Sequence, residues 1–199
     1  MTLYQLKPAF QAFLKPVMIR LHNRRVTPNH ITLTAMVLSF ITGVALIIFP
    51  QPERFILLPV ALLARMALNA LDGMLAREYN QTSRSGAMLN EIGDVLSDIA
   101  LYLPFIFLPP SNALLVLIML FCSVMTEFCG VLAQTLNGTR SHAGPLGKSD
   151  RALAFGAWGV VLSGWPQIGQ WSNAVWGVAV ILLLWTCVNR CRSALSDEG

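Results

Sequence analysis

The sequence predicts an all-α integral membrane protein with six transmembrane helices and an N-terminal amphipathic interfacial helix. Three observations support this fold class. Of 199 residues, 55% are hydrophobic and only 12% are charged, and the mean hydropathy is +0.59, which is too apolar for an ordinary soluble domain. Long apolar runs alternate with short turns rich in proline, glycine and asparagine. The lysines and arginines concentrate in alternate connections, as the positive-inside rule requires.

Two domains follow from this pattern. Residues 1–26 are predicted to be an amphipathic interfacial segment, and residues 27–199 a six-helix membrane domain. Apolar side chains recur at helical spacing in the first segment, with polar side chains on the opposite side. A helix packed on the bundle is an alternative to one lying on the membrane surface. Pro8 and Pro16 are expected to interrupt this helix. The segment lacks the features of a signal peptide, so we expect it to be retained.

The membrane domain is divided by capping and turn residues. Thr27 and Pro28 provide a hydroxyl N-cap and a first-turn proline for the first span. The distribution of basic residues places both termini in the cytoplasm. The six predicted spans cover residues 30–49, 54–77, 86–108, 113–136, 151–165 and 172–189.

Acidic and amide side chains interrupt the apolar pattern between the second and third spans. They are Asn69 and Asp72 on one helix, and Asn90, Asp94 and Asp98 on the next. Spacings of three and four residues place the members of each set on one helical face. Each ionised carboxylate near the centre of a membrane helix costs roughly 2.5–3.5 kcal/mol on insertion scales. We therefore interpret this cluster as a functional site.

Glycines and arginines beside the cluster suit a phosphate ligand. Gly73 and Gly86 flank the polar turn, and a residue without Cβ lets a bulky polyanion approach the backbone. Arg77 and Arg84 offer positive charge for phosphate. Two facing helices with oxygen side chains and a nearby arginine suit a divalent metal that holds a diphosphate.

The stretch from Asn69 to Asp94 resembles the signature of the CDP-alcohol phosphatidyltransferases, D-x2-D-G-x2-A-R-x8-G-x3-D-x3-D. The spacings, both glycines and the Ala-Arg pair match. Asn69 and Asn90 stand where the pattern has its first and third aspartates. The resemblance extends to the six-helix layout. Within the family, the chain resembles an enterobacterial inner-membrane member. This resemblance therefore implies a location in the bacterial inner membrane.

The resemblance implies a membrane phosphotransferase of phospholipid biosynthesis. Such an enzyme moves a phosphatidyl-type group from a CDP-activated lipid or alcohol to an acceptor hydroxyl and releases CMP. The implied metal ligands are Asn69, Asp72, Asn90 and Asp94, of which Asp94 also matches the proton acceptor. The implied CDP contacts are Asn29, Thr32, Gly73, Arg77, Ser83 and Gly86, and the implied contacts of the lipid phosphate or acceptor are Lys148 and Arg151.

Simpler interpretations stay open for some of these residues. Thr32 could bond only its own helix backbone, and Lys148 and Arg151 could be ordinary positive-inside residues. Arg65 shares a helical face with the motif, so we expect it to pair with an acid inside the bundle. Glu127 is the candidate, because it is the carboxylate deep in the fourth span.

The charge at the four motif positions predicts one tightly held Mg²⁺ or Mn²⁺. An asparagine carbonyl can coordinate such an ion but brings no charge. Asp72 and Asp94 therefore balance a single divalent ion. Glu91 or Asp98 turning inward, or the substrate phosphates, could recruit a second.

Two other functions remain open. The asparagines are compatible with a catalytically silent relative that binds CDP-lipid or stabilises a partner membrane enzyme. A small transporter would need polar residues along a whole pore, whereas here they crowd one end. The expected partners are a CDP-activated lipid, an alcohol acceptor of unknown identity and membrane lipids, and not nucleic acid. Ser39 and Gly43 have the spacing that permits close helix approach, as in a homodimer.

Overall fold

The computed structural model describes the backbone of residues 3–196 and the side chains of residues 10–196, and within this range its regular structure is entirely helical. The α-helices are α1 (Leu3–Asn23), α2 (Pro28–Ile48), α3 (Leu57–Glu78), α4 (Arg84–Tyr102), α5 (Ala113–Asn137), α6 (Lys148–Gly164) and α7 (Ser172–Leu195). Three 3-10 helices connect them at η1 (Pro52–Ile56), η2 (Leu103–Phe107) and η3 (Pro166–Trp171).

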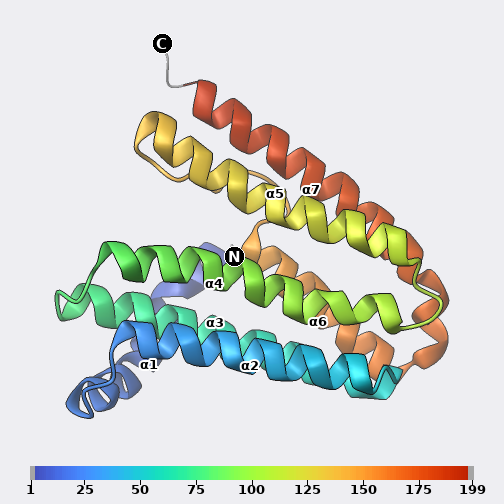
Figure 1. The fold of residues 1–199 in the computed structure, drawn as a ribbon, viewed down its shortest axis with the longest axis horizontal. Helices are drawn as coiled ribbons and strands as arrows, with labels where there is room; N and C mark the ends of the chain where they lie inside the picture. The colour runs from blue at the N-terminus through green and yellow to red at the C-terminus, as the bar shows by residue number, and fades with distance from the viewer. Residues whose placement is uncertain (1–2, 197–199) are drawn as a thin grey trace.

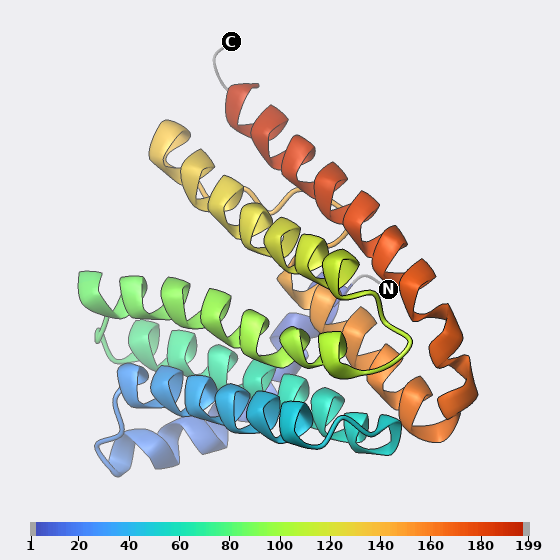
Figure 2. The same cartoon turned by 45° about the vertical axis from the view of Figure 1, so that its right-hand side comes forward.

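Helices α2 to α7 run back and forth, so that their connections gather at two ends of the molecule (Figure 1). The turns after α1 and α3 and the C-terminal ends of α5 and α7 lie toward one end. The connections after α2, α4 and α6 lie at the other, and the rotated view shows the same arrangement (Figure 2). Helix α2 packs on α3 and α4, and α5 packs on α7. In the described part of the chain, six α-helices, α2 to α7, thus follow α1.

Four segments of the described chain are long and apolar enough to cross a membrane. They are Pro28–Ile48, Pro52–Glu78, Ala113–Asn137 and Pro166–Leu195. Helix α6 has only 17 residues, and α4 carries three acids, Glu91, Asp94 and Asp98, together with other polar residues. Helix α4 corresponds to the third predicted span and lacks the apolar composition of the other four. Helix α6 corresponds to the fifth and lacks their length.

Aromatic side chains form the core at the end remote from the polar turn between α3 and α4. The Phe105 ring lies 5.1 Å from Phe55 and 4.5 Å from Trp176 between ring centroids. The Tyr102 and Phe155 rings meet edge to face at 4.7 Å. These are favourable separations for aromatic pairs, and all five residues are fully buried. This core joins five of the helical elements and leaves the opposite end available for polar side chains.

Helix α1 is unbroken over its whole length and packs against α3. Leu14 and Met18 are buried in a cluster with apolar side chains of α3, while Phe13 is 76% exposed. The expected interruption at Pro8 and Pro16 is wrong. A proline removes one backbone hydrogen bond, and packing on α3 offsets that loss.

The small-residue pair on α2 faces the interior of the chain. Ser39 is fully buried, and a Cβ atom on Gly43 would clash with the Ala100 carbonyl of α4. The pair therefore serves the contact between α2 and α4. It is not open to a second copy of the chain, so it gives no support to a homodimer.

Six membrane crossings with cytoplasmic termini predict a definite labelling pattern. In a variant whose native cysteines are replaced by alanine, cysteines introduced at Gln51 and Gln170 should react with a membrane-impermeant maleimide in intact cells. A cysteine at Gln81 should react only after the membrane is opened. All three positions are exposed, so burial does not confuse the measurement. The opposite pattern would reverse the topology.

Candidate metal and diphosphate site

The first and last motif positions contact each other directly. Asn69 on α3 donates its Nδ2–H to Asp94 Oδ1 on α4, at 2.8 Å. Asn90 lies one helical turn before Asp94 on α4 and is half-buried. The side chains that the sequence places on two separate helical faces therefore meet between α3 and α4.

Helix α2 reaches the same site through Thr32. Its hydroxyl lies 2.9 Å from Asp72 Oδ2 and 3.2 Å from the Pro28 carbonyl oxygen. The hydroxyl thus bonds its own helix, as the simpler interpretation expected, and also the motif aspartate. Its contact with CDP stays a prediction. Asp72 is only 7% exposed, so this contact lies inside the bundle.

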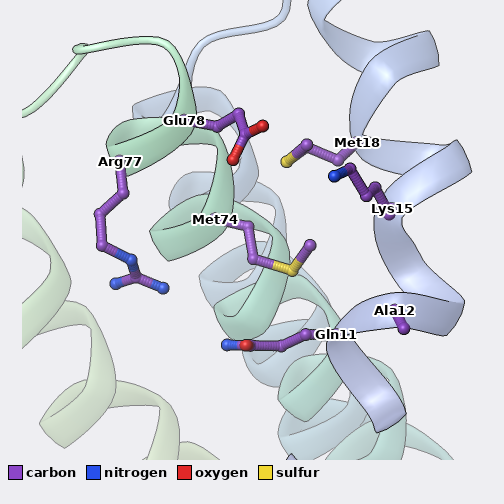
Figure 3. Close-up of a pocket in the computed structure, with 7 residues that line it drawn as sticks. All are labelled: Gln11, Ala12, Lys15, Met18, Met74, Arg77 and Glu78. Carbon is purple, nitrogen blue, oxygen red and sulfur yellow. The ribbon is translucent and has the colours of Figure 1, made fainter. Parts of the chain in front are cut away.

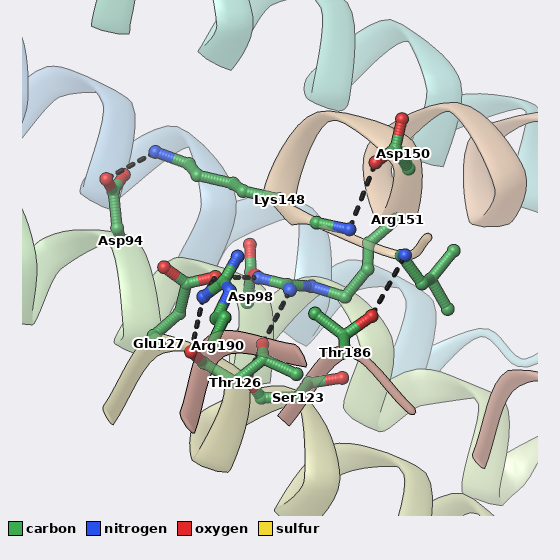
Figure 4. A network of polar contacts seen from close by, with 12 residues as sticks. Asp94, Asp98, Ser123, Thr126, Glu127, Lys148, Asp150, Arg151, Thr186 and Arg190 are labelled. Atoms are coloured by element: carbon green, nitrogen blue, oxygen red, sulfur yellow. Dashed lines mark hydrogen bonds and ion pairs between the residues drawn. The ribbon is translucent and has the colours of Figure 1, made fainter. Parts of the chain in front are cut away.

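The Asp94 carboxylate is surrounded by donors from two helices, α3 and α6. Oδ1 accepts from Asn69 and also lies 3.3 Å from Arg65 Nη2, which donates to the Asp94 backbone carbonyl at 2.8 Å. Oδ2 forms an ion pair with the Lys148 ammonium at the start of α6 (Figure 4). In this arrangement both carboxylate oxygens of Asp94 have cationic partners.

The expected pairing of Arg65 with Glu127 is wrong. Arg65 pairs with Asp94 and Asp98, which lie one turn apart on α4. Periodicity identified the face of α3 that carries Arg65, but it could not show that α4 and not α5 lies opposite that face.

Glu127 is instead shared by three arginines, as Figure 4 shows in part. Its Oε1 lies 2.9 Å from Arg151 Nη2 and 3.6 Å from Arg190 Nη1, and its Oε2 lies 2.6 Å from Arg140 Nη2. Arg140 also pairs with Glu91. The cluster joins α4, α5, α6, α7 and the loop before α6 behind the motif.

Lys148 and Arg151 lie in different surroundings although both belong to the first turn of α6. Arg151 is fully buried, and its Nη2 pairs with Asp98 Oδ2 at 2.7 Å as well as with Glu127. Its Nη1 donates to Thr126 Oγ1 at 2.9 Å. Lys148 is one-third exposed and reaches the motif. Arg151 thus connects helices, whereas Lys148 lies beside Asp94.

Arg140 and Arg190 belong to this charged interior and were not identified from sequence. Arg190 is buried in a largely apolar helix and donates to the Thr126 carbonyl. An ionisable side chain within an apolar helix indicates a position inside the bundle. The interior position of Arg190 could therefore have been predicted from the sequence. Arg140 lies in a polar loop, where the sequence offered no such signal.

Three residues implied as CDP contacts converge at the start of α4. Ser83 Oγ accepts from the Gly86 backbone N–H at 3.0 Å. A Cβ atom on Gly86 would lie 2.9 Å from both Ser83 Oγ and Asn29 Oδ1. Because Gly86 has no Cβ, the Asn29 side chain of α2 can lie close to the N-terminus of α4.

Arg77 and Gly73 also lie together, one turn apart on α3. A Cβ atom on Gly73 would be 3.2 Å from Arg77 Nη1, so the glycine provides space for the guanidinium. A pocket of about 240 Å³ lies between α1 and α3, and Arg77 extends from its α3 wall on the side away from α1 (Figure 3). It is lined by Gln11, Ala12, Lys15, Met18, Met74, Arg77 and Glu78.

The donor set of the motif fits one hard divalent ion. Among residues 3–196, no three His, Cys, Asp or Glu side chains are grouped so that they could hold a metal. The motif instead combines two carboxylates with two amides, whose oxygens are the ligand type that Mg²⁺ and Mn²⁺ prefer. Asp72 and Asp94 together match the charge of a single ion.

The fold and the site define a helical integral membrane protein with a polar, phosphate-suited motif near one end of its bundle. The chain belongs to the CDP-alcohol phosphatidyltransferase family, whose sequence model matches residues 25–188. It is 64% identical to the inner membrane protein YnbA of Escherichia coli K12, over 98% of this chain and 97% of that protein. The resemblance inferred from the motif is confirmed.

Solved structures support the same fold. The chain is similar to Mycobacterium tuberculosis phosphatidylinositol phosphate synthase PgsA1 with CDP-DAG bound, with a TM-score of 0.75 and 20% identity over 90% of this chain and 92% of that one. The structure of PgsA1 with manganese and citrate gives a TM-score of 0.74 and 22% identity, over 90% and 87% of the two chains. At these identities the similarity concerns the fold alone.

Proposed function

We propose that the chain is a phosphotransferase of phospholipid biosynthesis that uses a CDP-activated lipid. It moves a substituted phosphate group to an acceptor hydroxyl and releases CMP. The observation that carries this proposal is that Asn69 and Asp94 of the family motif contact each other and that Lys148 of α6 pairs with Asp94. Asp72 of the same motif is buried and is bonded by Thr32 of α2. The fold shared with a synthase crystallised with CDP-DAG supports the substrate class.

In the proposed reaction, the acceptor oxygen bonds to the β-phosphorus while the bond between that phosphorus and the CMP oxygen breaks. Asp94 receives the hydroxyl proton, because a positioned carboxylate can act as a general base. One Mg²⁺ or Mn²⁺ held by Asn69, Asp72, Asn90 and Asp94 would supply positive charge at the diphosphate. Arg77 adds a planar pair of donors suited to phosphate oxygens.

We further propose six membrane crossings in an inner membrane with both termini in the cytoplasm, and an interfacial position for residues 1–26. Charged side chains on α4 and α6 pair with each other inside the bundle, as Asp98 does with Arg151, so their cost in the membrane is reduced. The inner-membrane relative supports the location.

Lipid mass spectrometry tests the proposed function. Cells that overproduce the wild-type chain should accumulate a phospholipid class and lose CDP-activated lipid, and cells producing Asp94→Ala should not. Asp150→Ala is the matched control, because Asp150 accepts from the Gly147 backbone N–H and forms none of the motif contacts. An unchanged lipid profile in the wild type would reject the enzyme and favour the silent relative.

The silent relative is a second candidate because of one specific observation. Both oxygens of Asp94 are engaged by Asn69, Arg65 and Lys148, so the proposed base must lose a partner before it can accept a proton. A chain that only binds would show CDP-lipid affinity without release of CMP, and the two measurements together separate the candidates.

We predict one tight divalent ion in the substrate-free protein. Two +2 ions ~4 Å apart repel by ~17 kcal/mol at an effective dielectric constant of ~20, and negative bridging ligands must offset this. Calorimetric titration with MnCl₂ should give one tight site in the wild type and a second in the Asn69→Asp, Asn90→Asp double variant. Two tight sites in the wild type would contradict the charge argument.

A further inference from the structure

Lys148 is the exposed member of the cationic pair at Asp94. Its side chain is 33% exposed, whereas that of Arg65 is 4% exposed. Arg65 is also held by Asp98 and by the Asp94 backbone carbonyl. Lys148 has a flexible stem with four methylene groups, and no other hydrogen bond of its ammonium is seen in the described part of the chain. Of the two cations, Lys148 is therefore the one that can leave.

The position of Lys148 affects the charge of the whole motif. Its ammonium pairs with Asp94, which together with Asp72 makes up the two carboxylates at the motif positions. With Lys148 paired to Asp94, the combined negative charge of the two carboxylates is partly neutralised. A divalent ion that binds to these carboxylates is therefore repelled by the Lys148 ammonium. Arg65 is shared with Asp98, and even without it a bound ion and Lys148 together carry one positive charge more than the two carboxylates balance.

A diphosphate ligand would remove that excess. Its oxygens would lie near the divalent ion, and they would give the displaced ammonium an anionic partner. We propose that Lys148 is the resident counter-ion of Asp94, which a divalent ion displaces and which then binds the diphosphate of the nucleotide. This inference rests on the proposed function. To the phosphate contact that the resemblance implies for Lys148, it adds the role of a counter-ion that holds Asp94 before the metal binds.

The proposal makes metal and nucleotide binding cooperative. Lys148 competes with the ion for Asp94 when no diphosphate is present, and it assists binding when both ligands are present. Coupling between two ligands is reciprocal, so each should raise the affinity for the other by the same factor. An ordinary basic flank would attract the nucleotide but would not weaken the binding of the metal alone.

Titrations with MnCl₂ and with CDP, on the full chain in lipid nanodiscs, test this role. Free Mn²⁺ is counted by electron paramagnetic resonance. In Lys148→Met we expect Mn²⁺ alone to bind about tenfold more tightly than in the wild type, and CDP at saturating Mn²⁺ to bind about tenfold more weakly, within the usual range of coupling. Lys148→Arg keeps the charge and should retain most of the coupling.

The control is Arg192→Met, which removes an exposed base near the end of α7 that has no contact with the motif aspartates in the described part of the chain. It should leave both titrations unchanged. Unaltered or weaker Mn²⁺ binding in Lys148→Met, with the thermal midpoint of the wild type, would overturn the proposal. If Lys148→Met is unstable, Lys148→Gln provides the same comparison. Failure of the wild type to bind CDP would reject the proposed function instead, while the titration with Mn²⁺ alone would still test the pairing with Asp94.

Discussion

Replacing Asp94 with asparagine should lower the rate of CMP release by ~10²–10⁴-fold, which is the usual contribution of a positioned general base. The asparagine side chain has nearly the same shape, but it cannot accept the hydroxyl proton. It also has no charge with which to form an ion pair with the Lys148 ammonium. The rate is measured with purified protein, CDP-lipid and a panel of acceptor alcohols.

Metal affinity must be separated from proton transfer in this experiment. The variant should therefore be compared with the wild type at Mn²⁺ concentrations that saturate both, because Asp94 is also a proposed ligand. Asp150→Asn serves as the control and should keep nearly full activity. A rate for Asp94→Asn within a few-fold of the wild type at saturating metal would remove Asp94 from the role of base.

Much of the fold could be predicted because local signals decide it. Thr27 accepts from the His30 backbone N–H, and Pro28 begins α2, as its capping sequence predicts. Asn112 caps α5 in the same way. The polar turns between apolar runs likewise place the starts of the remaining helices within about three residues, whereas the predicted ends of α4 and α7 differ from the observed ends by about six. The interruption of α1 was predicted incorrectly, because contacts with α3 lie far away in sequence.

The sequence predicts which site residues share a helical face, but it does not predict which residues face one another across neighbouring helices. The spacing of the motif correctly groups Asn69 with Asp72 and Asn90 with Asp94, since three- and four-residue steps share a face. It does not determine how neighbouring helices are rotated. The partner of Arg65 depends on that rotation and was therefore predicted incorrectly.

Charge balance links the motif to the rest of the bundle. Among the described residues, the buried acids are Asp72, Asp98 and Glu127, and the buried bases are Arg65, Arg151 and Arg190. Three positive charges thus accompany three negative charges away from water. A buried pair is strongly destabilised when one partner is removed, because the other charge is left uncompensated. The polar interior is consequently a structural requirement as well as a candidate site.

Glu127 should be the most sensitive position of this interior. It accepts from Arg140 and Arg151 and pairs with Arg190. Glu127→Leu keeps similar volume but leaves an excess of positive charge, and we expect the free energy of unfolding to fall by about 3–5 kcal/mol. The fall is measured from thermal unfolding in detergent.

The control is Glu91→Leu, which removes another carboxylate partner of Arg140. The Glu91 side chain is 36% exposed, so water compensates part of its lost charge pair, and the loss should be smaller than that of Glu127→Leu. Adding Arg190→Met to Glu127→Leu removes one excess charge and should recover part of the stability, because contacting residues are not additive. Equal losses for Glu91→Leu and Glu127→Leu would show that the cluster at Glu127 does not depend on charge pairing.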